Sequence, residues 1–219
     1  MPRALFEKTG MAVYISHLDL MRLFQRSFKR AGLPLTHTKG FNPRPSVSIA
    51  LPLSLGVESI CELLDFDLEG VSCPCEEIKD RLNRSLTEGV RVLQVYDDGA
   101  KIKHLTYLSC DIFMEYDAGV SENAVERITG LFASSELLVE KKSKNGVTEQ
   151  NIIPMIRSLQ ARQTDACTLT LRARVCCQNP SLNPMQLCAA IEHYLPGFAP
   201  DFVRCTREEV LDLQENIFR

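Results

Sequence analysis

The sequence lacks a long apolar segment of the kind that crosses a membrane or leads a secreted protein. Charged or polar residues interrupt every apolar run well short of the roughly 20 residues that a membrane-spanning helix needs. Residues 1–4, Met-Pro-Arg-Ala, also lack the apolar core of a signal peptide. We therefore expect no membrane association and a location in the cytoplasm.

The cysteines lack the spacing of a metal site. The chain has nine of them, but no C-x-x-C pair typical of zinc sites and no C-x-x-x-C-x-x-C run that would hold a radical SAM cluster. The closest pairs are Cys73 with Cys75 and Cys176 with Cys177. Without export, such cysteines stay reduced and serve mostly as small buried apolar residues. We therefore expect neither a metal nor a cofactor.

The motifs of several large enzyme classes are absent too. The chain contains no Walker phosphate-binding loop, dinucleotide fingerprint, zinc-protease motif or G-x-S-x-G elbow. Its 219 residues, 45% hydrophobic and 24% charged, are typical of an ordinary globular protein with one large domain or two small ones.

Positive charge is concentrated near the N-terminus. The net charge is −3, yet residues 1–56 carry eight lysines and arginines against only Glu7 and Asp19. That segment is therefore +6 and the remainder −9. A chain with this asymmetry can present one cationic face to a polyanion.

A capped amphipathic helix is predicted in this basic segment. Ser16 is expected to be the N-cap, with Asp19 completing a capping box, so the helix begins at His17. Gly32 and Pro34 end it. One face carries apolar residues at three- and four-residue spacing: Leu20, Met21, Phe24, Phe28 and Ala31. Another face carries cations, which we take as substrate-binding candidates: Arg22, Arg26, Lys29 and Arg30.

Residues 36–46 are predicted to form an irregular but rigid loop that binds anions. They contribute three further substrate-binding candidates, Lys39, Asn42 and Arg44. Glycine and proline in the segment allow close backbone approach and limit its flexing. The loop also carries His37, which together with His17 could act as general base and acid in RNA cleavage.

The same stretch resembles a known family. The runs 16–22 (SHLDLMR), 30–34 (RAGLP) and 40–45 (GFNPRP), with Pro52, Leu53 and Gly56, are similar to the radical-SAM-linked protein family. Members of that family are encoded beside a radical SAM protein or fused to its C-terminus. The resemblance covers roughly the first 60 residues. It implies a radical SAM partner and no defined activity.

The order of predicted elements indicates an α+β fold with two tandem ferredoxin-like units. The first unit, residues 1–98, has the order β-α-β-β-α-β, with antiparallel sheets. Its elements are an extended segment broken near Gly10, the capped helix, strands at 46–50 and 61–69, a helix opened by Pro74 and a strand at 90–96. In the second, the acidic residues 104–219, the strands are expected at 108–116, 137–142, 168–176 and 202–208. Its helices are expected at 121–132, capped by Ser121, and after Asn183. Residues 145–164 are left as an insertion, with a turn at Asn145 and Gly146.

Three functions fit these features. The first is a non-catalytic accessory module that binds RNA or a ribonucleoprotein through the substrate-binding candidates and presents it to a radical SAM enzyme. The second is a metal-independent endoribonuclease that uses His17 and His37; this rests on analogy with paired ferredoxin-like nucleases. The third is a small-molecule or anion-binding enzyme whose pocket is floored by residues 40–46.

The cysteine spacing generates a first testable prediction. Elemental analysis of the purified protein should find neither iron nor zinc in stoichiometric amount. Stoichiometric metal that disappears in the Cys73→Ser/Cys75→Ser variant would overturn this interpretation.

Overall fold

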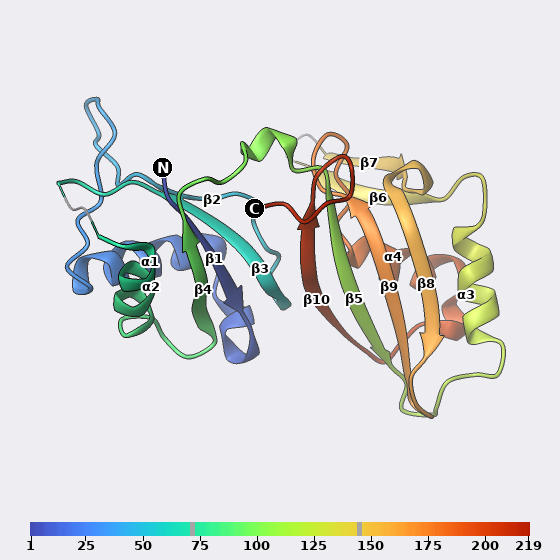
Figure 1. Cartoon of the computed structure of the whole chain (residues 1–219). Coiled ribbons are helices and arrows are strands. Elements are labelled where there is room, and N and C mark those ends of the chain that lie inside the picture. Colours follow the sequence, from blue (N-terminus) through green and yellow to red (C-terminus); the bar gives the residue numbers. More distant parts are fainter. Residues whose placement is uncertain (71–72, 144–145) are drawn as a thin grey trace. The chain divides into compact units, whose positions relative to one another are not determined.

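The computed structural model describes residues 1–70, 73–143 and 146–219, which form four α-helices and ten strands (Figure 1). The predicted α+β class is confirmed. The chain divides into two compact units, residues 1–104 with 218–219 and residues 105–217. Among the described residues no helix is long and apolar enough to cross a membrane.

The first unit is a sheet covered by two helices. Its sheet has the order β4-β1-β3-β2, and each of these pairs is antiparallel. The elements are β1 (Arg3–Lys8), α1 (His17–Arg30), β2 (Val47–Ile49), β3 (Val57–Phe66), α2 (Cys75–Asn83) and β4 (Val90–Tyr96). Where the sequence analysis extended the first strand beyond Gly10, the chain forms a 3₁₀ helix instead, Gly10–Tyr14.

The last two residues return to the first unit, although the sequence analysis assigned them to the second. Phe218 is 2% exposed and lies under the guanidinium of Arg3, 5.6 Å from its ring centre. The carbonyl of Arg219 accepts a hydrogen bond from the backbone of Ala100 at 2.7 Å. Arg3 also forms a bidentate pair with Asp65, at 2.6 and 3.1 Å. A buried ring and a paired guanidinium therefore hold the chain end to β1.

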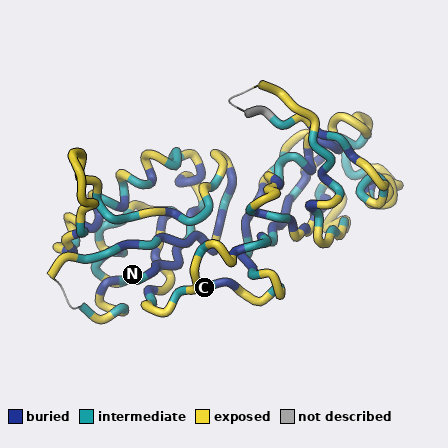
Figure 2. The backbone as a smooth tube through the Cα atoms, turned by 90° about the horizontal axis from the view of Figure 1, so that it is seen from above, coloured by how far each residue is buried: buried dark blue, intermediate teal, exposed yellow. Residues whose placement is uncertain are grey.

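Two aromatic pairs attach α1 to the sheet. Phe24 packs edge-on against Phe6 of β1 with ring centres 4.8 Å apart, and Phe28 packs against Phe66 of β3 at 4.9 Å. All four side chains are fully buried in one apolar cluster with residues of α2 and β4. Large buried rings contribute much of the favourable free energy of a small core. Buried segments run through the interior of each unit in Figure 2.

Both ends of α1 follow the sequence prediction. Ser16 accepts a hydrogen bond from the backbone N–H of Asp19 at 3.2 Å, so the helix begins at His17 as expected. At the other end Gly32 has φ +65°, a conformation that glycine adopts without strain. Gly32 and Leu33 donate backbone hydrogen bonds to Lys29 and Phe28 at 3.1 and 2.9 Å. This is the Schellman closure of a helix.

A reciprocal pair of arginines, which no local signal in the sequence predicts, joins the two helix ends. Arg81 of α2 donates to the carbonyls of Ala31 (2.6 and 2.9 Å) and Gly32 (2.9 Å). Arg30 of α1 donates to the carbonyl of Ser85, just beyond α2, at 2.6 Å. The last carbonyls of a helix carry partial negative charge and lack intrahelical donors, so a cation stabilises them. We call Arg30 and Arg81 with these acceptors the arginine clasp.

The second unit has a similar sheet with an added hairpin. Its sheet has the order β10-β5-β9-β8 with antiparallel pairs, and β6 pairs separately with β7. The elements are β5 (Tyr107–Glu115), α3 (Ala124–Phe132), β6 (Leu138–Ser143), β7 (Gly146–Asn151), β8 (Ile156–Gln163), β9 (Thr168–Cys176), α4 (Met185–Tyr194) and β10 (Phe202–Leu211). A 3₁₀ turn, Ile153–Met155, precedes β8.

Two details of the second unit were predicted wrongly. The strand expected at 137–142 belongs to the added hairpin, while β8 comes from the segment taken as an insertion. β8 is an edge strand with many exposed polar residues, so its sequence lacks the apolar alternation of a buried strand. The third helix begins at Ala124 after Asn123, and Ser121 is not its N-cap. Asn145, expected in the hairpin turn, lies outside the described residues.

The cysteines are free thiols, as expected of reduced residues. Five are buried: Cys61, Cys110, Cys177, Cys188 and Cys205. Burial raises the pKa of Cys177 and of Cys188 to about 12, because the thiolate loses its hydration. These two thiols are therefore protonated at neutral pH and act as apolar core residues.

The arginine clasp should stabilise the first unit. Replacing Arg81 with alanine removes hydrogen bonds from a charged donor, so the free energy of unfolding should fall by about 1.5–3 kcal/mol. Arg30→Ala should also destabilise the protein. Arg26→Ala, an exposed residue of the same helix, is the control and should change stability by less than about 0.5 kcal/mol. Denaturant titrations measure all three, and equal stability of the three variants would contradict the clasp.

Candidate functional site

Residues 36–46 lie outside the helices and strands, as the predicted irregular loop does, and an isolated bridge between His37 and Pro45 gives the loop the form of a narrow hairpin. Thr38 donates its backbone N–H to the carbonyl of Arg44 at 2.9 Å, and Ser46 donates to Thr36 at 2.8 Å. The Thr38 hydroxyl accepts from the N–H of Arg44 at 3.0 Å. This hairpin, light blue in Figure 1, projects from the first unit. Backbone hydrogen bonds fix its two arms. The side chains of Lys39, Asn42 and Arg44 are exposed to solvent.

Three cations of α1 form an exposed face opposite its apolar side. Arg22 pairs with Asp19 at 2.9 Å and remains 64% exposed. Arg26 and Lys29 are exposed as well. We call the exposed cations of α1 and of the hairpin the basic surface; its members are Arg22, Arg26, Lys29, Lys39 and Arg44.

Arg30 is not part of the basic surface, although it was predicted to bind substrate together with the other cations of the helix. Its guanidinium is engaged by the hydroxyl of Ser27 at 3.0 Å and the carbonyl of Ser85 at 2.6 Å. Ser27 is fully buried. Arg30 therefore connects the ends of the two helices, and we assign it a structural role.

A groove of about 490 Å³ lies between the second half of α1 and the base of the hairpin. Phe28, Leu33 and Leu35 give it an apolar lining; each is at most 8% exposed. Its polar side chains are Gln25, Lys29, His37 and Glu69. The volume falls in the usual range of ligand pockets. Because it holds a carboxylate as well as a cation, the groove is not a plain anion site. Of the predicted loop, only His37 and Pro45 line it, and residues 40–44 do not.

The two candidate catalytic histidines lie at opposite ends of α1. His17 is the first residue of the helix, whereas His37 lines the groove together with Lys29 of the last turn. The helical rise between His17 and Lys29 is about 18 Å. A general base and a general acid must both reach the atoms of one phosphodiester. This geometry therefore gives no support to the histidine-pair nuclease.

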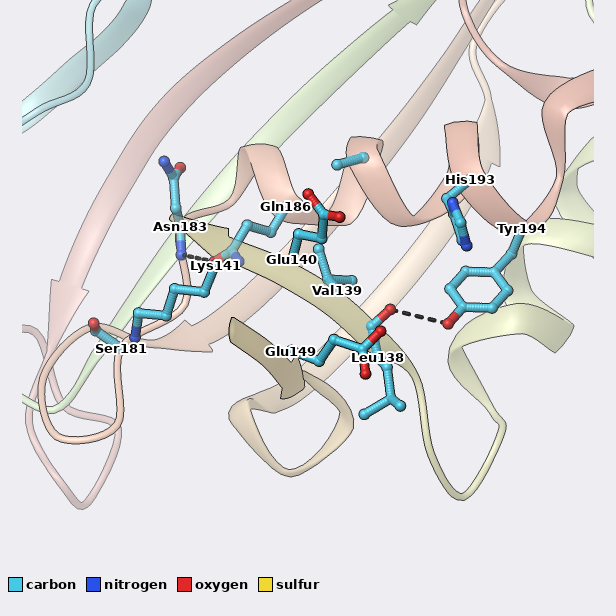
Figure 3. A pocket seen from close by; sticks show the side chains of 11 residues that line it. Leu138, Val139, Glu140, Lys141, Glu149, Ser181, Asn183, Gln186, His193 and Tyr194 are labelled. Carbon is cyan, nitrogen blue, oxygen red and sulfur yellow. Dashed lines mark hydrogen bonds between the residues drawn. The ribbon is translucent and has the colours of Figure 1, made fainter. Parts of the chain in front are cut away.

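The second unit contains a separate cleft of about 610 Å³ between its added hairpin and α4 (Figure 3). Tyr194 donates its hydroxyl to the carbonyl of Leu138 at 2.9 Å, which ties α4 to β6. His193 lies beside Tyr194 with ring centres 4.7 Å apart. Glu140 and Glu149 also line the cleft and are opposite each other across the β6–β7 ladder. Sequence reasoning missed His193, because β6 and α4 are far apart in the chain.

The chemistry of the two sites differs. The cleft carries two carboxylates, an imidazole and one lysine, Lys141, whereas the basic surface carries five cations. Among residues 1–70, 73–143 and 146–219, no group of three or more His, Cys, Asp or Glu side chains is arranged to hold a metal ion. Exposed guanidinium and ammonium groups bind phosphate and carboxylate oxygens. We therefore take the basic surface and its groove as the candidate functional site.

Several solved structures contain a chain with a similar fold. The chain is similar to a chain in the crystal structure of a Cbf5–Nop10–Gar1 complex, with a TM-score of 0.52 and 9% identity over 95% of this chain and 48% of the other. A chain of an H/ACA RNP bound to a substrate RNA containing 2'-deoxyuridine matches with a TM-score of 0.47 and 8% identity, over 94% and 46%. This protein thus spans about half the length of the chains it resembles. At these identities the likeness describes architecture alone.

Sequence comparison identifies a family. No curated protein matches the sequence. The model of a family described as an uncharacterized protein conserved in bacteria, DUF2344, matches residues 2–184. That match spans most of the 219 residues, and the chain belongs to the DUF2344 family.

Proposed function

We propose that the first unit binds RNA, alone or within a ribonucleoprotein, and that the protein is a non-catalytic accessory module. The observation that carries the proposal is the basic surface: five exposed cations on one helix face and one projecting hairpin. Between Asp19 and Glu58 the sequence contains no acidic residue. Asp19, at the start of α1, is paired with Arg22. Beyond it, phosphates of a polynucleotide can approach Arg26, Lys29 and the hairpin without meeting a carboxylate from either element.

The donor types also favour a nucleic acid. Arginine presents a planar fork of donors that matches phosphate oxygens, and lysine adds a compact charge. Both arise from elements whose backbone is fixed, α1 by its core contacts and the hairpin by its backbone hydrogen bonds. Binding then costs little ordering of the backbone.

The partner in this proposal is a radical SAM enzyme, to which the protein presents its bound RNA in the cytoplasm. Support for the partner comes from the resemblance of residues 16–22, 30–34 and 40–45 to the radical-SAM-linked family. We also propose that each unit is a ferredoxin-like domain. The order β-α-β-β-α-β supports this for the first unit, and the equivalent order with an added hairpin supports it for the second.

The groove supports a second candidate function, that of an enzyme that binds a small molecule. Its apolar lining and four polar side chains suit an organic ligand better than a bare anion, because a carboxylate, Glu69, lines the groove as well as Lys29. His37 is the side chain in this groove best suited to proton transfer. A variant at this position separates the two functions.

Affinity for RNA should depend steeply on salt. Replacing Arg22, Arg26 and Lys29 together with alanine should make the slope of log affinity against log salt shallower by about 2, since each phosphate contact on a single strand contributes about 0.7. A control variant removes three exposed cations elsewhere in the first unit: Arg84, Arg91 and Lys103. Fluorescence titrations with cellular RNA provide the measurement. Equal slopes for the two variants would count against the basic surface.

Replacing Arg44 with alanine should weaken RNA binding by roughly 1.5–3 kcal/mol, the worth of a charge-assisted hydrogen bond. The fold should survive, because Arg44 supports the hairpin through its backbone and its side chain is exposed. Circular dichroism melting checks the fold. An unfolded Arg44→Ala protein would mean that the hairpin is structural.

His37→Ala separates the accessory module from the enzymes. An accessory module should lose at most part of its affinity for RNA. Unchanged binding with lost cleavage or turnover would instead favour catalysis at the groove.

A further inference from the structure

One large apolar side chain of the hairpin, Phe41, takes no part in any core. Phe41, at the tip of the hairpin, has a relative exposure of 108%, compared with 82% for Met11 and 71% for Met1. Its neighbour Gly40 has φ +147°, and a side chain added there would meet no atom within 4 Å. Burial of an aromatic ring is favourable and its exposure is not. The side chain of Phe41 therefore does not stabilise the fold, and a polar residue at this position would serve the fold equally well.

Its surroundings are cationic and polar. Lys39 and Arg44 are exposed on the two arms, and Asn42 follows Phe41 directly. The hydrogen bonds between Thr38 and Arg44 hold the arms close to each other behind the tip. Phe41 is thus a single exposed ring on a short, fixed support, with a positively charged residue before it and another after it in the chain.

We propose that Phe41 stacks on an unpaired nucleobase while Lys39 and Arg44 contact the phosphates on either side of it. Proteins bind single-stranded RNA by this combination, because every base has a flat π face and its flanking phosphates are anionic. Bases inside a duplex are already stacked on their neighbours. The hairpin should therefore favour single-stranded or looped RNA. This inference rests on the proposed RNA-binding function and adds the chemical group that the hairpin recognises.

A hydrophobic pocket on a protein partner fits the same ring less well. Cores of protein interfaces are depleted in charge, and several apolar residues usually form the centre of the patch. Here the residues on either side of Phe41 are polar, glycine or proline: Thr38, Lys39, Gly40, Asn42, Pro43 and Arg44. Lysine in particular is depleted at such interfaces. The observations therefore favour a nucleobase.

The absence of tryptophan from the chain makes a direct test possible. Phe41→Trp introduces a single indole at the tip, and stacking on a base should quench its fluorescence. The probes are an oligouridylate and an abasic ribose-phosphate oligomer of equal length. We expect quenching by the first and none by the second. Met11→Trp, at another exposed position of the first unit, is the matched control and should respond to neither.

Affinities complete the test. Phe41→Ala should bind the oligouridylate about 5- to 150-fold more weakly than the wild type, the range expected for one lost base stack. Its affinity for the abasic oligomer should not change, nor should its melting temperature. Restored affinity in Phe41→Trp would support stacking by an aromatic ring.

The outcomes separate this inference from the proposed function. If the wild type binds both oligomers equally and Phe41→Ala does the same, the surface binds phosphates and the stacking inference is overturned while the proposed function stands. If the wild type binds neither oligomer at low salt, both are overturned. If Phe41→Ala leaves RNA affinity unchanged but weakens binding to the radical SAM protein, Phe41 contacts a protein and the stacking inference fails.

Discussion

The candidate site depends on the burial of one face of α1. Phe24 and Phe28 are held against β1 and β3, and this contact fixes the rotation of the helix about its axis. Because an α-helix has 3.6 residues per turn, side chains offset from these by two or five positions emerge on the opposite side. Arg22 and Arg26 are in such positions and are exposed. The same contact that stabilises the core therefore orients the cations toward solvent.

The C-terminal end of α1 then determines where the hairpin starts. Gly32 reverses the chain, and an added Cβ would lie 2.9 Å from the Arg81 guanidinium that binds the carbonyls at this end. Leu33 and Leu35, both buried, fix the segment that leads into the hairpin. This segment lines the groove together with Phe28 and Lys29 from the helix and His37 from the hairpin. The second half of α1 and the base of the hairpin thus line one groove.

Local signals in the sequence predicted α1 and most strands correctly, whereas features that depend on distant residues were missed. Ser16 and Gly32 mark the helix ends because capping is a property of adjacent residues. Arg30 could not be separated from Arg26 by sequence, since its acceptor, Ser85, is 55 residues away. β8 was missed because edge strands tolerate polar residues on both faces. The exposure of Phe41 could not be predicted either, because an apolar residue near glycine and proline is compatible with a buried turn as well as with an exposed one.

RNA that binds the first unit should contact it through α1 and the hairpin. Ultraviolet crosslinking of the protein to cellular RNA, followed by mass spectrometry of the crosslinked peptides, identifies the residues in contact. We expect crosslinks within residues 17–46, with Phe41 and its neighbours among the modified positions. Crosslinks confined to the second unit, around His193 and Tyr194 for instance, would show that RNA binds elsewhere.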